Sequence, residues 1–168
     1  MRLFVAVNFD SNIITALNEY TAQLKAAAIS GSFTRKENLH LTLAFIGETD
    51  RVKEATQAVR CVSVPSFTLE LSEVGVFKRY DGDIYWIGAR KSQELIDLQN
   101  QVVDKLIMQG FTLENRFFTP HITLGRRVFL HSDFAPVRID ACMTVSKISL
   151  MKSEQIGGRL VYKQIYNH

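Results

Sequence analysis

Two short stretches of the sequence carry side chains that can do chemistry together. The tetrapeptides HLTL and HITL begin at His40 and His121, in the two halves of the chain. Because side chains on a strand alternate between faces, His40 shares a face with Thr42, and His121 shares one with Thr123. One such tetrapeptide is common in strands. The second copy indicates that the two histidines work as a pair.

Two imidazoles and two hydroxyls suit the cleavage of a phosphodiester. An imidazole has an unperturbed pKa of about 6.5, so a neutral one can take a proton from water while a charged one gives a proton to the leaving oxygen. The threonine hydroxyls can donate hydrogen bonds to phosphoryl oxygens, and arginine or lysine can balance their charge. If two related lobes face one another, the His and Thr pairs meet across a cleft.

Other interpretations of the histidines fit less well. A single such motif is usually structural, with the histidine bonded to a carbonyl and the threonine chosen for strand propensity. A metal site requires a third ligand, and neither motif strand contains Asp, Glu or Cys. The chain has no G-x-S-x-G and no phosphate-binding glycine loop of the Walker type. His131 and His168 lie outside such motifs, and we expect both at the surface.

Composition is typical of one cytoplasmic domain with a substantial core. The 168 residues are 46% hydrophobic and 22% charged, and no segment resembles a signal peptide or a membrane span. The net charge of +3 favours an anionic partner only weakly. Cys61 and Cys142 stand among apolar neighbours without a C-x-x-C spacing, so we expect two buried free thiols.

Apolar periodicity predicts an alternation of strands and helices. A helix from Asp10 or Ser11 to about residue 29 would carry the stripe Ile13, Leu17, Tyr20, Leu24 and Ala28 and end at Gly31. Further helices are expected from Thr49 or Asp50 up to Pro65, and from Ser92 to Gly110. Strands are expected at 3–9, 38–46, 67–72, 76–77, 84–89, 117–125, 137–151 and 160–166, with hairpin turns at Asp81-Gly82 and Gly157-Gly158.

These elements predict an α+β fold. Each half of the chain holds a helix followed by an H-x-T strand, and no Pro-, Gly- or Ser-rich linker separates the halves. We expect residues 1–168 to form a single bilobal domain with two pseudo-symmetric lobes. Each lobe would be a mainly antiparallel sheet with helices on its outer side.

Four stretches resemble a known family. ENLHLTLAFIGE, FTPHITLGR and the opening MRLFVAV are similar to the two-histidine phosphoesterases, most closely the RNA 2',3'-cyclic phosphodiesterases first called 2'-5' RNA ligases. The late stretch LMKSEQIGGRLVYKQI resembles the closing hairpin of that family. The resemblance covers nearly the whole chain and implies a bilobal fold with both motifs in a central cleft.

The resemblance also implies roles for the motif residues. His40 would protonate the 3' leaving oxygen, His121 would activate water, and the product would be a 2'-phosphate, with no metal or other cofactor. Thr42 and Thr123 would hold the phosphate. The reverse reaction, which joins 2'-phosphodiester linkages, would be secondary.

Phe45 and Arg126 each lie five positions after a motif histidine. Phe45 could stack on a nucleobase and Arg126 could contact phosphate. Strict alternation turns both away from the histidines, so these roles require the strand to end or bulge, which Gly47 and Gly125 permit. Burial of Phe45 in the core is the alternative. Where many relatives carry Trp and Pro, this chain has FTRK at 33–36, which affects the surface flanking the substrate.

The leading hypothesis is therefore an enzyme that hydrolyses RNA ends carrying 2',3'-cyclic phosphate, such as tRNA halves. It would act as a cytoplasmic monomer, without metal or membrane. Two alternatives stay open. One is the same chemistry on a small nucleotide such as ADP-ribose cyclic phosphate. The other is a nucleotide- or RNA-binding module without turnover, although a binder needs no matched acid and base.

Overall fold

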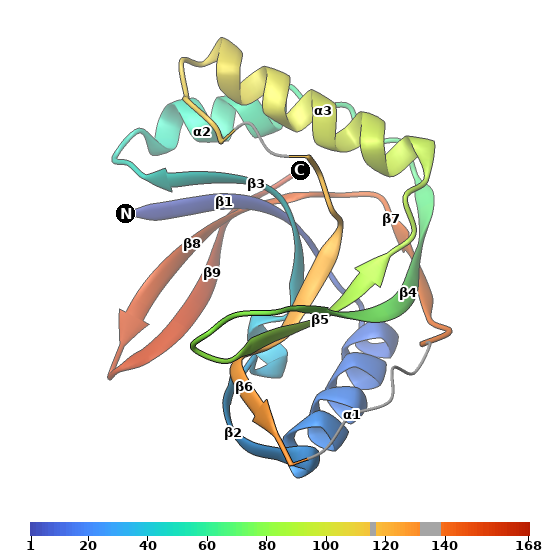
Figure 1. The fold of residues 1–168 in the computed structure, drawn as a ribbon. Helices are drawn as coiled ribbons and strands as arrows, with labels where there is room; N and C mark the ends of the chain where they lie inside the picture. Colours follow the sequence, from blue (N-terminus) through green and yellow to red (C-terminus); the bar gives the residue numbers. More distant parts are fainter. Residues whose placement is uncertain (115–116, 132–138) are drawn as a thin grey trace.

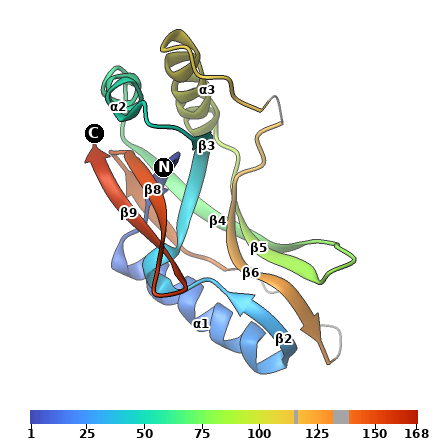
Figure 2. The same cartoon turned by 90° about the vertical axis from the view of Figure 1, so that its left-hand side faces the viewer.

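Two antiparallel sheets and the helices that cover them make up the fold (Figures 1 and 2). The computed structural model describes residues 1–114, 117–131 and 139–168. The first sheet has the order β3-β1-β8-β9. Its strands are β1 (Arg2–Asn8), β3 (His40–Glu48), β8 (Ser149–Ile156) and β9 (Arg159–Asn167). The α+β architecture expected from the sequence is confirmed.

The second sheet has the order β2-β6-β5-β4-β7. Its strands are β2 (Ala28–Phe33), β4 (Phe67–Phe77), β5 (Asp83–Ala89), β6 (His121–Leu130) and β7 (Cys142–Val145). The two HxT strands thus belong to different sheets, β3 to the first and β6 to the second. They contact each other where the sheets meet.

Helices α1 (Ser11–Ala27) and α3 (Gln93–Met108) begin where caps and apolar stripes predict them, whereas α2 (Val52–Arg60) begins after Arg51 rather than after Thr49 or Asp50. Helix α1 begins after Asp10, whose carboxylate accepts a hydrogen bond from the amide of Ile13 at 3.0 Å. Helix α3 begins after Ser92, whose hydroxyl accepts from the amide of Leu95 at 3.2 Å. The inner faces of both helices are buried in the core. In the described part of the chain, no helix has the length and apolar character needed to cross a bilayer.

Several expected boundaries are wrong. Strand β6 begins at His121 rather than at 117 and continues to Leu130, and the segments expected at 67–72 and 76–77 are one strand, β4. Helix α1 ends at Ala27, because residues 28–33 form β2 and pair with β6. Helix α2 (Val52–Arg60) ends well before Pro65. The long strand expected at 137–151 is two strands, β7 and β8, which pair in different sheets; its first two positions lie outside the described residues. For β2, β7 and β8, pairing with a distant segment overrides the local pattern.

Both cysteines are exposed, which corrects the expectation of buried thiols. Cys61 follows the end of α2, and Cys142 begins β7. Both thiols are free. Apolar neighbours in sequence do not bury a residue when its own side chain points away from the core.

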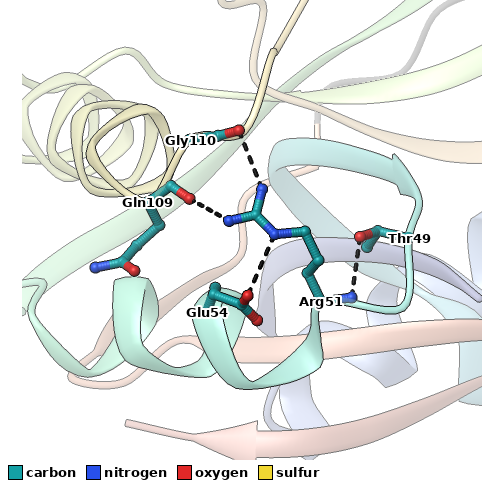
Figure 3. Close-up of polar contacts among 5 residues, drawn as sticks. All are labelled: Thr49, Arg51, Glu54, Gln109 and Gly110. Carbon is teal, nitrogen blue, oxygen red and sulfur yellow. Dashed lines mark hydrogen bonds and ion pairs between the residues drawn. The ribbon is translucent and has the colours of Figure 1, made fainter.

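One arginine joins the start of α2 to the end of α3 (Figure 3). The guanidinium of Arg51 donates to the carbonyls of Gln109 at 2.7 Å and Gly110 at 3.2 Å, and its Nε lies 3.3 Å from a Glu54 carboxylate oxygen. It also lies over the ring of Phe111, 4.8 Å from the centroid. Carbonyls at a helix C-terminus lack partners within the helix and favour a nearby cation. Arg51 therefore fixes the two helices beside the sheets that carry the motifs.

Candidate active site

The two motifs line one cleft between the sheets. Leu41 and Leu43 of β3 and Ile122 and Leu124 of β6 are buried, so the alternating histidines and threonines face the other way. The cleft has a volume of about 400 Å³. Its lining residues are Arg2, Phe4, Thr34, Asn38, His40, Thr42, Phe45, His121, Thr123, Arg126, Ser153, Leu160 and Tyr162. All six site residues named from the sequence lie in this cleft.

The two histidines have equivalent hydrogen bonds at Nδ1. Nδ1 of His40 lies 2.7 Å from the carbonyl oxygen of Asn38, and Nδ1 of His121 lies 2.7 Å from that of Thr119. A carbonyl can only accept, so Nδ1 carries the hydrogen in each ring and Nε2 is left for the chemistry. Nε2 of His40 lies 3.0 Å from the hydroxyl of Thr42. Each imidazole is thus oriented by the residue two positions before it.

Asn38 is a positioning residue that the sequence analysis missed. Its side chain is buried and donates to the carbonyl of Leu160 at 2.9 Å. Its side-chain oxygen accepts from the amide of Tyr162 at 3.2 Å. Because the carbonyl of Asn38 also accepts from His40, this residue ties the imidazole to β9, at the far edge of the same sheet.

Aromatic rings contact both imidazoles, and these too were not predicted. The centroid of His40 lies 4.8 Å from that of Phe4 and 5.0 Å from that of Tyr162. The centroid of His121 lies 5.5 Å from Phe77 and 6.0 Å from Trp86. The four rings come from β1, β9, β4 and β5. The alternation of side chains along β3 and β6 does not predict these rings, because they belong to other strands and reach the histidines only through strand pairing.

A glycine makes room for one of these rings. A Cβ atom placed on Gly75 would lie 2.0 Å from the indole of Trp86, so the ring rests directly on this backbone. Trp86 in turn contacts His121. Gly75 therefore has a packing role behind the second motif.

A bulge in each motif strand brings Phe45 and Arg126 into the cleft. In β3, neighbouring residues of β1 pair with Thr42 and Ala44, which leaves Leu43 as an extra residue. In β6, neighbouring residues of β5 pair with Thr123 and Gly125, which leaves Leu124 as the extra residue. Each bulge reverses the alternation one step after the threonine. The side chain of Phe45 is 58% exposed, which excludes its placement in the core.

The charge of the cleft suits an anion. Arg2 and Arg126 contribute cations, and the described residues that line the cleft include no carboxylate. The guanidinium of Arg126 lies 3.5 Å from the hydroxyl of Thr123. Elsewhere too, the described residues include no cluster of three or more His, Cys, Asp or Glu side chains arranged to hold a metal ion.

Burial is the main cause that lowers the pKa of His40 below its ordinary value. The hydrogen bond to Asn38 opposes this effect, and the nearby charges of Arg126 and His121 add to it. Burial also raises the pKa of the Tyr162 phenol, so this group keeps its hydrogen. The free site thus favours a neutral His40.

Two antiparallel sheets that meet at a cationic cleft, with one histidine from each sheet held in the same way, match the features expected of the two-histidine phosphoesterases. The chain belongs to the 2'-5' RNA ligase superfamily, whose family model matches residues 10–157.

Relatives from several organisms cover most of the chain. An RNA 2',3'-cyclic phosphodiesterase of Thermotoga maritima is 27% identical, over 99% of this chain and 94% of its own length. One of Escherichia coli K12 is 30% identical, over 96% and 92%. One of Archaeoglobus fulgidus is 35% identical, over 75% and 72%. The similarity therefore extends beyond the two motifs.

Solved structures share the whole fold. The crystal structure of E. coli LigT complexed with 3'-AMP matches with a TM-score of 0.82 at 28% identity, over 99% of this chain and 95% of that one. TT0787 of Thermus thermophilus matches with a TM-score of 0.88 at 22% identity, over 99% and 96%, which shows the fold alone.

Proposed function

We propose that this protein hydrolyses RNA ends that carry a 2',3'-cyclic phosphate and leaves a 2'-phosphate. The observation that carries the proposal is that His40 and His121 line the same cleft and that a carbonyl two positions earlier in the chain holds Nδ1 of each. The relatives named RNA 2',3'-cyclic phosphodiesterase support the same substrate class.

Each motif residue has a role in the proposed reaction. His121 accepts a proton from water, the water oxygen bonds to phosphorus, and the bond from phosphorus to the 3' oxygen breaks. His40 gives its proton to that leaving oxygen. Thr42 and Thr123 donate hydrogen bonds to the non-bridging oxygens, whose growing charge Arg126 balances. If the 5' hydroxyl of a second RNA took the place of water, the same groups would join the two strands through a 2'-5' phosphodiester, and the 3' oxygen would again leave with the proton from His40.

Phe45 has the geometry of a stacking platform beside this centre. Its ring lies in the cleft, is largely exposed and is 6.2 Å from that of Phe4. Exposed aromatic rings of this kind stack on unpaired bases. We propose that Phe45 holds the terminal nucleobase.

The proposal includes four further features. One chain supplies both histidines, which supports a monomeric enzyme. The core contains residues of both sheets, which supports a single bilobal domain over residues 1–168. Halves of cleaved tRNA are candidate substrates because they are RNA ends of this kind. The cytoplasmic location stays a prediction.

A short RNA ending in 2',3'-cyclic phosphate tests the function directly. Incubated with the protein in excess EDTA, it should be converted to a 2'-phosphate end, because water enters opposite the 3' oxygen. Phosphorus NMR of the product distinguishes 2'- from 3'-phosphate. A 3'-phosphate product would contradict the roles given above, and activity lost in EDTA and restored by one metal would contradict the metal-free mechanism.

The lowered pKa of His40 predicts the pH dependence of kcat/KM. As the general acid, His40 must be protonated, so the alkaline limb of kcat/KM should fall with an apparent pKa below about 6.5. Bound phosphate favours the charged imidazole, so the alkaline limb of kcat should lie at higher pH. In Arg126→Gln the alkaline limb of kcat/KM should move to higher pH, because a cation that disfavours protonation is gone.

Arg2→Gln is the matched control for this pH experiment. Arg2 lines the same cleft but is not among the groups that shift the pKa of His40. Its loss should leave both limbs in place. If Arg126→Gln moved the acidic limb upward instead, His40 would be the base.

A further inference from the structure

A second hollow opens beside the cleft and shares Arg126 and Leu160 with it. It has a volume of about 660 Å³. Its walls come from β2, from β6 and from the ends of the β4–β5 and β8–β9 hairpins, which project on the same side of the molecule (Figure 1). Since both sheets contribute, the hollow extends the cleft outward.

Arginines dominate the charge of this hollow. Arg79, Arg126 and Arg127 line it, and Asp81 is the carboxylate among its lining residues. The nearby carboxylate of Asp83 is paired with Lys78 at 2.7 Å. The hollow is therefore cationic, and guanidinium groups match phosphate oxygens in geometry as well as in charge.

The backbone of β6 is distorted where two of these arginines stand. Gly125 pairs with Tyr85 and Val128 with Asp83, so Arg126 and Arg127 together face one residue of β5. Both side chains are exposed as a result.

Arg127 adopts the left-handed region, with a φ of 52°, where glycine or asparagine would be less strained. Gly82 fits against it, since a Cβ there would lie 2.7 Å from the backbone of Arg127. Strain of this kind is typical of functional positions. In this conformation the side chain of Arg127 is exposed next to that of Arg126.

We propose that the hollow binds the phosphodiester backbone of the RNA strand just upstream of the cyclic phosphate. Arg79 and Arg127 would contact the phosphates, and Arg126 would stand at the junction with the catalytic cleft. Ile84 and Leu160 give apolar surface for ribose and base. The inference rests on the proposed function and deepens it, because it makes a polynucleotide the preferred substrate over a cyclic mononucleotide.

Two substrates with the same terminal base test the inference. One is a hexanucleotide ending in 2',3'-cyclic phosphate, and the other is the corresponding 2',3'-cyclic mononucleotide. We expect kcat/KM to be about tenfold higher for the hexanucleotide at low salt. Between 50 and 200 mM salt, its logarithm should fall with a slope steeper by about 1.4 than for the mononucleotide, since each phosphate contact on a single strand contributes about 0.7.

The double variant Arg79→Gln/Arg127→Asn should lose this preference. Its kcat/KM for the hexanucleotide should drop about tenfold and its extra salt slope should vanish, while the mononucleotide should react within about twofold of the wild-type rate. Asparagine tolerates the left-handed backbone, so the melting temperature should not fall. The matched control is Lys53→Gln/Lys91→Gln, which removes two exposed cations that line neither cavity and should leave both substrates unaffected.

Three outcomes would overturn the inference. One is equal kcat/KM for the two substrates in the wild type, which would instead favour a small cyclic nucleotide as substrate. Another is an equal fall for both substrates in the double variant. The third is an equal fall of the hexanucleotide rate in the lysine control. Should the double variant be unstable, Arg79→Gln alone is the substitute, because Arg79 lies in the β4–β5 turn. It should lower kcat/KM and the salt slope for the hexanucleotide and leave the mononucleotide rate unchanged. No activity on either substrate would contradict the proposed function itself.

Discussion

Replacing either His40 or His121 with alanine is expected to lower kcat on RNA 2',3'-cyclic phosphate by about 10²–10⁴-fold, the typical contribution of one proton-transfer group. Each imidazole transfers a proton on one side of phosphorus, either from the attacking water or to the leaving oxygen. A water molecule in its place would transfer that proton far less efficiently. The double variant should be far less than multiplicatively slower, because residues that act as a unit are not additive. Single-turnover rates on a labelled RNA end measure the effect.

A surface histidine provides the control for these variants. His131 is exposed at the end of β6 and lines neither cavity, so His131→Ala should retain the wild-type rate. Thermal melts should show that all four proteins are folded, since both motif histidines stand on the cleft face rather than in the core. Near-normal turnover in a folded His40 or His121 variant would rule out the paired mechanism.

The second large effect separates the roles of the two histidines. In a substrate whose 3' bridging oxygen is replaced by sulfur, the leaving thiolate needs little protonation, because thiols ionise near pH 8.5. On this substrate His40→Ala should regain most of its lost rate, about 10²-fold or more relative to the oxygen substrate. His121→Ala should stay slow, because the water still has to be deprotonated.

The pattern across the two variants decides the assignment. Rescue of His121→Ala instead of His40→Ala would reverse the roles. Equal rescue of both variants would mean that neither histidine is specifically the acid. The rate of the wild-type enzyme on the sulfur substrate provides the reference, since it corrects for intrinsic reactivity.

Local patterns predicted most elements of the fold because caps and periodicity act within a few residues. Asp10 and Ser92 mark their helix starts through single side-chain hydrogen bonds to nearby amides. Strand β2 was missed because Ala28 and Ile29 continue the helical pattern and Gly31 is typical of a helix end. Only pairing with β6 makes residues 28–33 a strand. The break between β7 and β8 was missed because the apolar stretch is continuous in sequence, whereas β7 pairs in the second sheet and β8 pairs in the first.

The motif residues of the site were predictable, and their surroundings were not. Duplication within one chain makes the His and Thr pairs visible. The sequence indicated that Phe45 and Arg126 could reach the cleft only if their strands ended or bulged. Both strands do bulge, and in β6 the bulge lies next to Gly125. The aromatic contacts of His40 come from Phe4 and Tyr162, which lie at opposite ends of the chain and meet only through the order of strands in the sheet.

The two equivalent bulges give the cleft an orientation. Each bulge delivers one extra side chain to the cleft at the same step of its strand, and the two side chains differ in kind: an aromatic ring from Phe45 and a cation from Arg126. In the proposed reaction a nucleoside would be held toward the ring and a phosphate toward the cation. An RNA end would then enter in one direction only, and that direction would decide which of two similarly held imidazoles meets the leaving oxygen.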